Sequence, residues 1–142
     1  MIDHIWTVLC LRAVIDVDSQ NVSIQNVLEQ LNLTVESGSD LVIGISYEIV
    51  SFWVRSEVET PVRGRSRITL VDPGGNTTPV AEMPIDLTAV ERARHRIYCQ
   101  GLRVTAPGRY IFRVELLEDG QREWRSVASV PLRVVFAAPK DG

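Results

Sequence analysis

The stretch GRYIFRVELLEDGQREWRSVA, residues 108–128, decides the fold. Two runs of alternating apolar and polar residues flank Asp119-Gly120. Alternation with a period of two is typical of β-strands that bury one face, so the stretch predicts a β-hairpin. A two-residue loop at Asp119-Gly120 would place charged residues such as Glu123 on the apolar face, which argues for a longer loop.

A three-residue loop that ends at Gly120 keeps one face of this hairpin apolar. It pairs Val114 with Trp124 and Phe112 with Ser126. The apolar set then continues through Ala128, Val130, Leu132, Val134 and Phe136. Because a slip of one residue would invert every side chain, we expect this register, with a type I turn and Gly120 in the left-handed region as a G1 bulge. The register predicts that Trp124 belongs to the core.

Strand-like runs recur along the rest of the chain, and turn residues separate them about every ten positions. Residues 22–35 fit a helical stripe as well as a strand, and the lack of a helix stop favours a strand. Pro79 and Pro84 indicate an edge strand. The expected strands cover residues 5–17, 22–35, 41–58, 64–71, 78–87 and 92–100, with a bulge or bend at Gly101 before Leu102 and Val104, besides the final hairpin. Eight or nine strands without a helix predict an all-β sandwich.

The alternation also assigns faces to these strands. In 41–58 it places Val50 and Phe52 on one face and Trp53 on a partly solvated face with Ser51 and Arg55. In 92–100 it places Ala93, His95, Ile97 and Cys99 on the face opposite Arg92, Arg94, Arg96 and Tyr98.

The chain has 142 residues, 45% hydrophobic and 23% charged, which predicts one globular domain over 1–137 with a frayed tail at 138–142. A second loop is expected at 37–40. The net charge of −3 gives no general attraction to nucleic acid or anionic lipid. No run reaches the roughly 18 apolar residues of a membrane span, and no basic segment precedes the first apolar run. These features favour a cytoplasmic protein with neither a nucleic-acid nor a membrane partner.

Motifs that carry chemistry are missing from the sequence. Cys10 and Cys99 are the only cysteines and lack the spacing of a zinc site, so free thiols are expected. Asp16, Asp18 and Asn21 offer oxygen ligands for calcium, but Asx turns explain the same residues and are favoured. His95 and Cys99 would lie about 13 Å apart on a strand, too far for a catalytic dyad. We therefore expect no enzyme activity, no metal and no cofactor.

Two arginine triplets are the strongest candidate for a binding surface. They are Arg63, Arg65 and Arg67, and Arg92, Arg94 and Arg96. Each repeats with a period of two, so each places three guanidinium groups on one sheet face. One interpretation is an anion or partner surface formed by Arg65, Arg67, Arg92, Arg94 and Arg96 with Tyr98 and Trp53. The favoured alternative is cross-strand pairing, with Arg63 and Arg65 against Glu57 and Glu59.

Several short motifs follow one another in a characteristic order. They are Asp3-His4, SIQNVLE (23–29), VDPGG (71–75), PGRYIF (107–112) and VPLRV (130–134). In this order they resemble an uncharacterised bacterial β-sandwich family known only as a domain of unknown function. The resemblance implies an immunoglobulin-like antiparallel β-sandwich and brings no catalytic residues with it.

The expected function is a non-catalytic interaction or assembly module that binds a protein partner or a second copy of itself. The alternative is a domain that binds small anions or carbohydrates through its exposed arginines.

Overall fold

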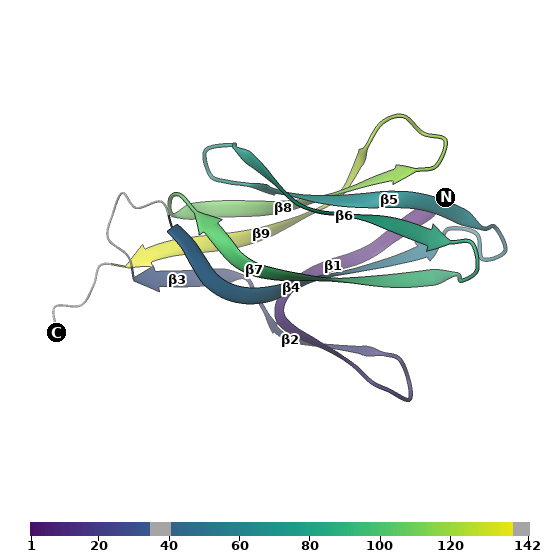
Figure 1. Ribbon diagram of the computed structural model, residues 1–142, viewed down its shortest axis with the longest axis horizontal. Coiled ribbons are helices and arrows are strands. Elements are labelled where there is room, and N and C mark those ends of the chain that lie inside the picture. The colour runs from purple at the N-terminus through teal and green to yellow at the C-terminus, as the bar shows by residue number, and fades with distance from the viewer. Residues whose placement is uncertain (35–40, 138–142) are drawn as a thin grey trace.

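The computed structural model describes residues 1–34 and 41–137, which form two packed β-sheets (Figure 1). The strands are β1 (Ile2–Ile15), β2 (Val22–Val27), β3 (Gln30–Thr34), β4 (Leu41–Arg55), β5 (Val62–Val71), β6 (Thr77–Leu87), β7 (Arg92–Val104), β8 (Gly108–Glu118) and β9 (Arg125–Ala137). The expected all-β sandwich is confirmed, and residues 22–27 and 30–34 are strands. The predicted loop at 37–40 and the predicted tail at 138–142 lie outside the described residues. No described segment forms a helix of the length and apolar character that crossing a membrane requires.

The strand order is β2-β1-β4-β7 in one sheet and β3-β9-β8-β5-β6 in the other. The prolines of β6 predicted an edge strand, and β6 is the last strand of its sheet. All neighbours are antiparallel except β3 and β9, so the prediction of a fully antiparallel sandwich is wrong for this pair. Leu28 and Glu29 carry the chain from β2 in one sheet to β3 in the other, where it runs in the same direction as β9.

The core between the sheets centres on three fully buried aromatic residues, Trp53, Tyr110 and Phe112. The prediction that Trp53 lies on a partly solvated face is therefore wrong. The opposite face of β4 misled the assignment because it is also apolar: Val50 is buried there with Cys10 and Ala13. Trp6, Val8, Val22 and Ile24 pack over this second cluster. Strand β4 is therefore buried on both faces.

The final hairpin differs from the expected register. Phe112 pairs with Val130 and Val114 with Ala128, and a bulge then shifts the pairing so that Glu115 lies opposite Ser126. The apolar side chains from Ala128 onward face the core, as expected. The bulge inverts the facing of the residues that precede it, so the prediction that Trp124 is a core residue is wrong.

The turn of this hairpin is also longer than predicted. Strand pairing ends at Leu116 and Arg125, so the expected three-residue loop is wrong. The Gln121 amide donates to the Glu118 carbonyl at 3.0 Å, and Gly120 has a φ of +89°. The left-handed conformation of Gly120 is confirmed. A positive φ at the third turn position is the type II pattern, so the predicted type I turn is wrong.

Gly101 lies at the predicted irregularity in β7. Its φ is +86°, and the pairing shifts between Ile43 and Ser46 on the neighbouring strand β4. Two residues of β4 therefore lie opposite Gly101, so the extra residue belongs to β4 and not to β7. This bulge lies beside the end of β7 that lines a groove described below.

A tyrosine hydroxyl ties the β7–β8 connection to the core. Tyr110 is fully buried, and its hydroxyl donates to the Ala106 carbonyl at 2.7 Å. The same oxygen accepts from the amides of Thr105 and Ala106. One buried side chain thus satisfies three backbone groups of the loop.

Candidate functional site

The arginines of β5 are neutralised by carboxylates of the strands on either side. Arg63 lies 3.6 Å from Asp86 and Arg65 lies 2.6 Å from Glu82, both on β6. Arg67 lies 3.1 Å from Glu115 on β8. Cross-strand pairing was the favoured expectation, but the predicted partners, Glu57 and Glu59, are wrong because β6 lies beside β5 and supplies the carboxylates.

Trp124 packs on this outer surface, where the Arg67 guanidinium lies 4.2 Å from its ring centroid. The guanidinium of Arg67 thus contacts both an aromatic face and the Glu115 carboxylate. Of the predicted surface residues, Arg65 and Arg67 therefore belong to paired networks that offer no free positive charge.

The arginines of β7 are in a different electrostatic situation. Arg96 is ion-paired with Glu48 at 3.0 Å, donates to the Ala13 carbonyl at 2.9 Å, and lies 5.2 Å from the Tyr98 ring. Arg94 donates to the Gln20 carbonyl at 2.7 Å and has no carboxylate partner among the described residues. Its Nε is buried without a hydrogen-bond partner in that same part of the chain.

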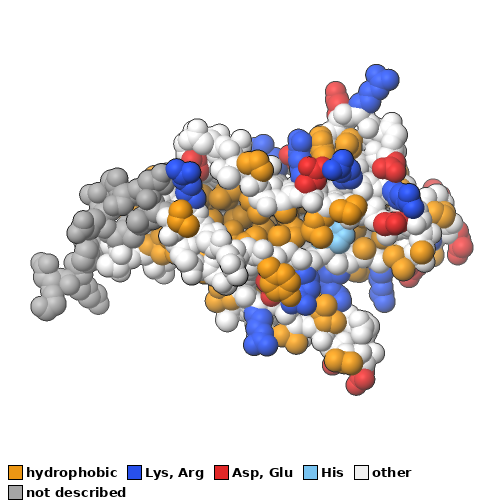
Figure 2. Space-filling view, viewed as in Figure 1, with side chains coloured by type: hydrophobic (Ala, Val, Ile, Leu, Met, Phe, Trp, Pro, Cys, Tyr) orange, Lys and Arg blue, Asp and Glu red, His pale blue; other side chains and the backbone are white. Residues whose placement is uncertain are grey.

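Arg92 is exposed, and its side chain makes no hydrogen bond or ion pair within residues 1–34 and 41–137. Figure 2 shows the same contrast on one face: acidic and basic side chains mix over β5 and β6, and basic side chains gather near β7 and β2. Two guanidinium groups, those of Arg92 and Arg94, thus remain without a carboxylate at one end of β7.

A groove of about 650 Å³ adjoins these two arginines on the outer face of the four-stranded sheet. Trp6 and Phe52 stack in it, with ring centroids 5.6 Å apart and an interplanar angle of 25°. The other lining residues are Gln20, Asn21, Val22, Ile24, Arg92, Ala93 and Arg94. The site therefore combines a flat aromatic floor with two cationic groups.

A bulge in β1 places Trp6 in this groove. His4 pairs with Trp53 and Trp6 pairs with Phe52, so Ile5 is the extra residue. Without the extra residue Trp6 would face the core, because facing alternates along a strand. Phe52 was not predicted as a site residue, and alternation carries no signal for a bulge at Ile5.

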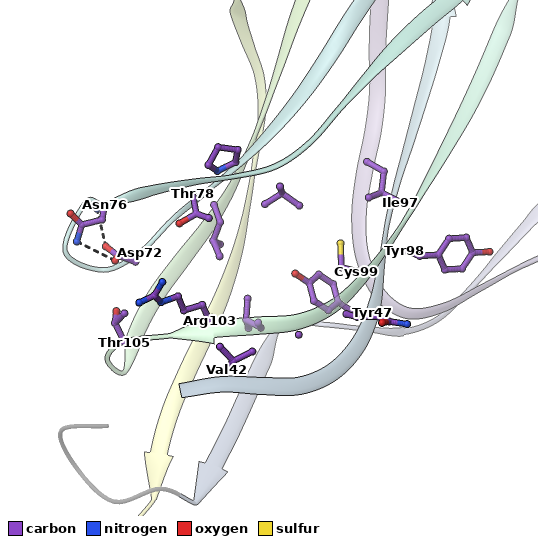
Figure 3. Close-up of a pocket in the computed structure, with 16 residues that line it drawn as sticks. Val42, Tyr47, Asp72, Asn76, Thr78, Ile97, Tyr98, Cys99, Arg103 and Thr105 are labelled. Atoms are coloured by element: carbon purple, nitrogen blue, oxygen red, sulfur yellow. Dashed lines mark hydrogen bonds between the residues drawn. The ribbon is translucent and has the colours of Figure 1, made fainter. Parts of the chain in front are cut away.

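A second groove of about 650 Å³ lies between the sheets, next to the β5–β6 hairpin and β7 (Figure 3). Tyr47, Ile97 and Cys99 point toward it, and Tyr98 points away. The predicted faces of β7 are confirmed by this arrangement. Leu70, Val80 and Leu102 add apolar lining. Figure 2 shows the apolar side chains of the interior through the opening between the sheets.

The Cys99 thiol in this second groove is unreactive near pH 7. Burial raises the pKa of Cys99, against the effect of its hydrogen bond with Tyr47. Burial also raises the pKa of the Tyr47 phenol. Both groups are neutral near pH 7, and a thiol is a weak nucleophile in that state. Both Cys99 and Cys10 are free.

A polar cluster lies inside the sandwich around Trp53. The His4 ring lies edge-on to Trp53 at 5.0 Å, and its Nε2 is hydrogen-bonded to the Thr7 hydroxyl at 2.7 Å. Thr7 contacts the Ser51 hydroxyl at 2.9 Å. Ser51 is 2% exposed, so the hydroxyl that could act as a nucleophile is closed off from solvent. Burial lowers the pKa of His4 and of His95.

The possible calcium ligands form an Asx turn. Asp16 Oδ1 accepts from the amides of Asp18 and Ser19, at 3.0 and 2.7 Å. These hydrogen bonds, with the Ser19 amide as the largest cause, lower the pKa of Asp16. Across the described part of the chain, no three histidine, cysteine or acidic side chains cluster closely enough to hold a metal ion.

No protein-family model matches this chain, and no curated protein matches it. Among solved structures, a β-glucosidase from Listeria innocua is 14% identical with a TM-score of 0.49, over 78% of this chain and 15% of that chain. The alkylpurine DNA glycosylase AlkC of Pseudomonas fluorescens is 14% identical with a TM-score of 0.39, over 75% and 27% of the two chains. The N-terminal domain of PorA is 12% identical with a TM-score of 0.30, over 92% and 97%. This chain thus spans about 15% of the length of the β-glucosidase. All three TM-scores lie below 0.5, so these similarities support no assignment of substrate or partner.

Proposed function

We propose that this chain is a non-catalytic interaction module that binds an acidic partner through the arginine-bearing face of β7. One observation carries the proposal: Arg92 and Arg94 have no carboxylate partner in the described residues, whereas the arginines of β5 are all neutralised. An unpaired guanidinium is a strong donor for carboxylate and phosphate groups. The net charge of −3 limits this attraction to the local site.

The proposal is tested by binding of a glutamate-rich peptide at increasing salt concentrations. Trp6 lies in the groove beside both arginines, so its fluorescence reports binding. The variant Arg92→Ser/Arg94→Ser is expected to lose most of the affinity and of the salt dependence. Arg63→Ser/Arg65→Ser is the matched control, because its two arginines are already paired. Equal affinities of the two double variants would contradict the proposal.

A second candidate function is binding of a small anionic ligand, such as an acidic sugar, in the groove itself. The stacked Trp6 and Phe52 rings favour it, because sugar and aromatic faces pack together through their apolar surfaces. Titration with glucuronate is expected to quench Trp6 fluorescence, and Trp6→Leu to abolish that signal. Quenching that is retained in Trp6→Leu would exclude this groove as the binding site.

For the fold, we propose the immunoglobulin-like type of sandwich. The strand order supports it. The edge strand β3 runs parallel to the last strand, β9, and all other neighbouring strands are antiparallel. The Tyr110 hydroxyl supports it further, because a tyrosine bonded to the backbone just upstream is the tyrosine corner of that fold. A cytoplasmic location and self-association stay predictions.

A further inference from the structure

The outer edge of β7 is open. Strand β7 ends its sheet, with β4 on one side, and no strand within residues 1–34 or 41–137 pairs with its other side. Every second residue of an edge strand points its amide and carbonyl away from the sheet. Strand β7 has thirteen residues, so this row of unpaired groups is long. Such a row is a template for a further strand.

The neighbouring edge, that of β6, is closed to the same kind of pairing. Pro79 and Pro84 interrupt β6, and a proline has no amide to donate. Its carboxylates Glu82 and Asp86 are already paired with arginines of β5. Strand β7 contains no proline. The two edges flank the same opening of the sandwich (Figure 1), and of these two only the β6 edge is interrupted by prolines.

The two faces of β7 determine which kind of side chain a further strand would need on each of its own faces. On the inner face, Ile97 and Cys99 border the apolar groove between the sheets, which Leu70 and Val80 also line. On the outer face lie the arginines and Tyr98. Side chains of a strand alternate between faces, so one set would face the apolar groove and the other would lie on the outer face that carries Arg92 and Arg94.

We propose that an extended segment of a partner protein, in which acidic and apolar residues alternate, adds to the four-stranded sheet as a fifth strand next to β7. The inference rests on the proposed function and names how the acidic partner binds. Backbone hydrogen bonds supply affinity, and the groove and the Arg92 and Arg94 side chains select the alternating pattern. A second copy of β7 is a poorer occupant, because β7 contains no acidic residue that could pair with Arg92 and Arg94.

A short synthetic peptide of alternating glutamate and valine tests this binding mode, with the full chain as receptor. A peptide of the same residues in block order is the control for charge, and is expected to bind at least about tenfold more weakly. Two further peptides carry N-methyl groups on alternate peptide bonds, in the two possible phases. One phase is expected to lose about tenfold or more in affinity and the other to bind normally, because only alternate amides face β7.

Hydrogen exchange locates the bound peptide. Amides of residues 92–104 are expected to exchange more slowly in the complex, and those of β6 to be unchanged. If both N-methylated peptides bind as tightly as the parent, or if β7 gains no protection, strand addition is wrong. The acidic-partner function survives that result if binding still depends on Arg94. If neither the alternating nor the block peptide binds, the proposed function fails as well.

Discussion

The buried ion pair between Glu48 and Arg96 gives the sharpest test of the electrostatic description of β7. The Glu48 side chain is 6% exposed and that of Arg96 is 26% exposed. Glu48 accepts from the Ala13 amide at 2.6 Å and from the Arg96 Nε and Nη2 at 3.1 and 3.0 Å. Replacing Glu48 by Leu keeps a similar volume and leaves the guanidinium and the Ala13 amide without their acceptor.

The expected loss in the free energy of unfolding depends on which charges stay buried in each variant. Removing one partner of a buried pair costs about 3–5 kcal/mol, and the partial exposure of Arg96 places Glu48→Leu near the lower limit, at about 3 kcal/mol. Arg96→Leu leaves an unpaired carboxylate and is expected to cost about 3 kcal/mol as well. The double variant buries no charge and loses only the hydrogen bonds to Ala13, again about 3 kcal/mol or less. The two single effects therefore overlap, with a coupling energy of about 3 kcal/mol.

Urea unfolding followed by tryptophan fluorescence measures all three variants, with a constant m-value as the check that only stability has changed. Arg65→Leu is the matched control, because its pair with Glu82 is exposed, at 59% and 45%, and an exposed pair contributes about 0–1 kcal/mol. Additive effects of the two single substitutions, or a cost of Glu48→Leu no larger than that of Arg65→Leu, would refute the reasoning.

Three further predictions concern the scaffold. Tyr110→Phe is expected to cost about 2 kcal/mol, because it orphans backbone groups including the Thr105 amide; an unchanged Tm would contradict this. Gly64→Ala is expected to cost about 1–3 kcal/mol in urea unfolding, because a Cβ would lie 2.9 Å from the Leu117 carbonyl, and wild-type stability would show that the strands separate freely. Stability is expected to fall as the pH drops below 6.5, because burial lowers the pKa of His95 from that value and the unfolded chain takes up the proton first. His95→Leu should flatten this dependence in urea titrations at several pH values, and an unaltered slope would exclude His95 as its cause.

The alternating pattern of the sequence located the strands well, because a half-buried strand is a local property. Residues 92–100 show this: their faces were assigned from the sequence and agree with the packing of Ile97 and Cys99. The predicted orientation of the side chains was wrong where an extra residue interrupts a strand. The bulge between Ala128 and Ser126 moved Trp124 to the surface, and alternation within β9 contains no mark of it.

Assignment of the interior failed for β4 because both of its faces are apolar. Val50 and Trp53 are each fully buried, on opposite sides of the strand. The choice between those sides depends on the packing of β1 and β2 over Val50, which involves residues distant in sequence. Hydrophobicity along the strand carries no information about it.

The arginines of the candidate site were predicted from the sequence, but the partners that neutralise some of them were not. The spacing of two arginine triplets was visible in the sequence, but the partners of Arg63 and Arg65 are set by the order of strands in the sheet. Only the register of β5 against β6 brings Asp86 and Glu82 to those arginines and leaves Arg92 and Arg94 without a carboxylate. The groove beside them depends in turn on the bulge at Ile5.

The unequal edges on the two sides of the sandwich opening also limit the size of any assembly. Edge pairing that can repeat, head to tail, produces filaments, because each added copy presents a fresh edge to the next. Here the edge at β6 lacks amides at Pro79 and Pro84, and the edge at β7 offers a second copy no carboxylate for its arginines. A strand donated to β7 therefore adds one strand to the sheet without starting a series of β6-to-β7 contacts between copies. We expect complexes of one chain with one segment, a fixed stoichiometry that protects a protein with a long open edge from aggregation.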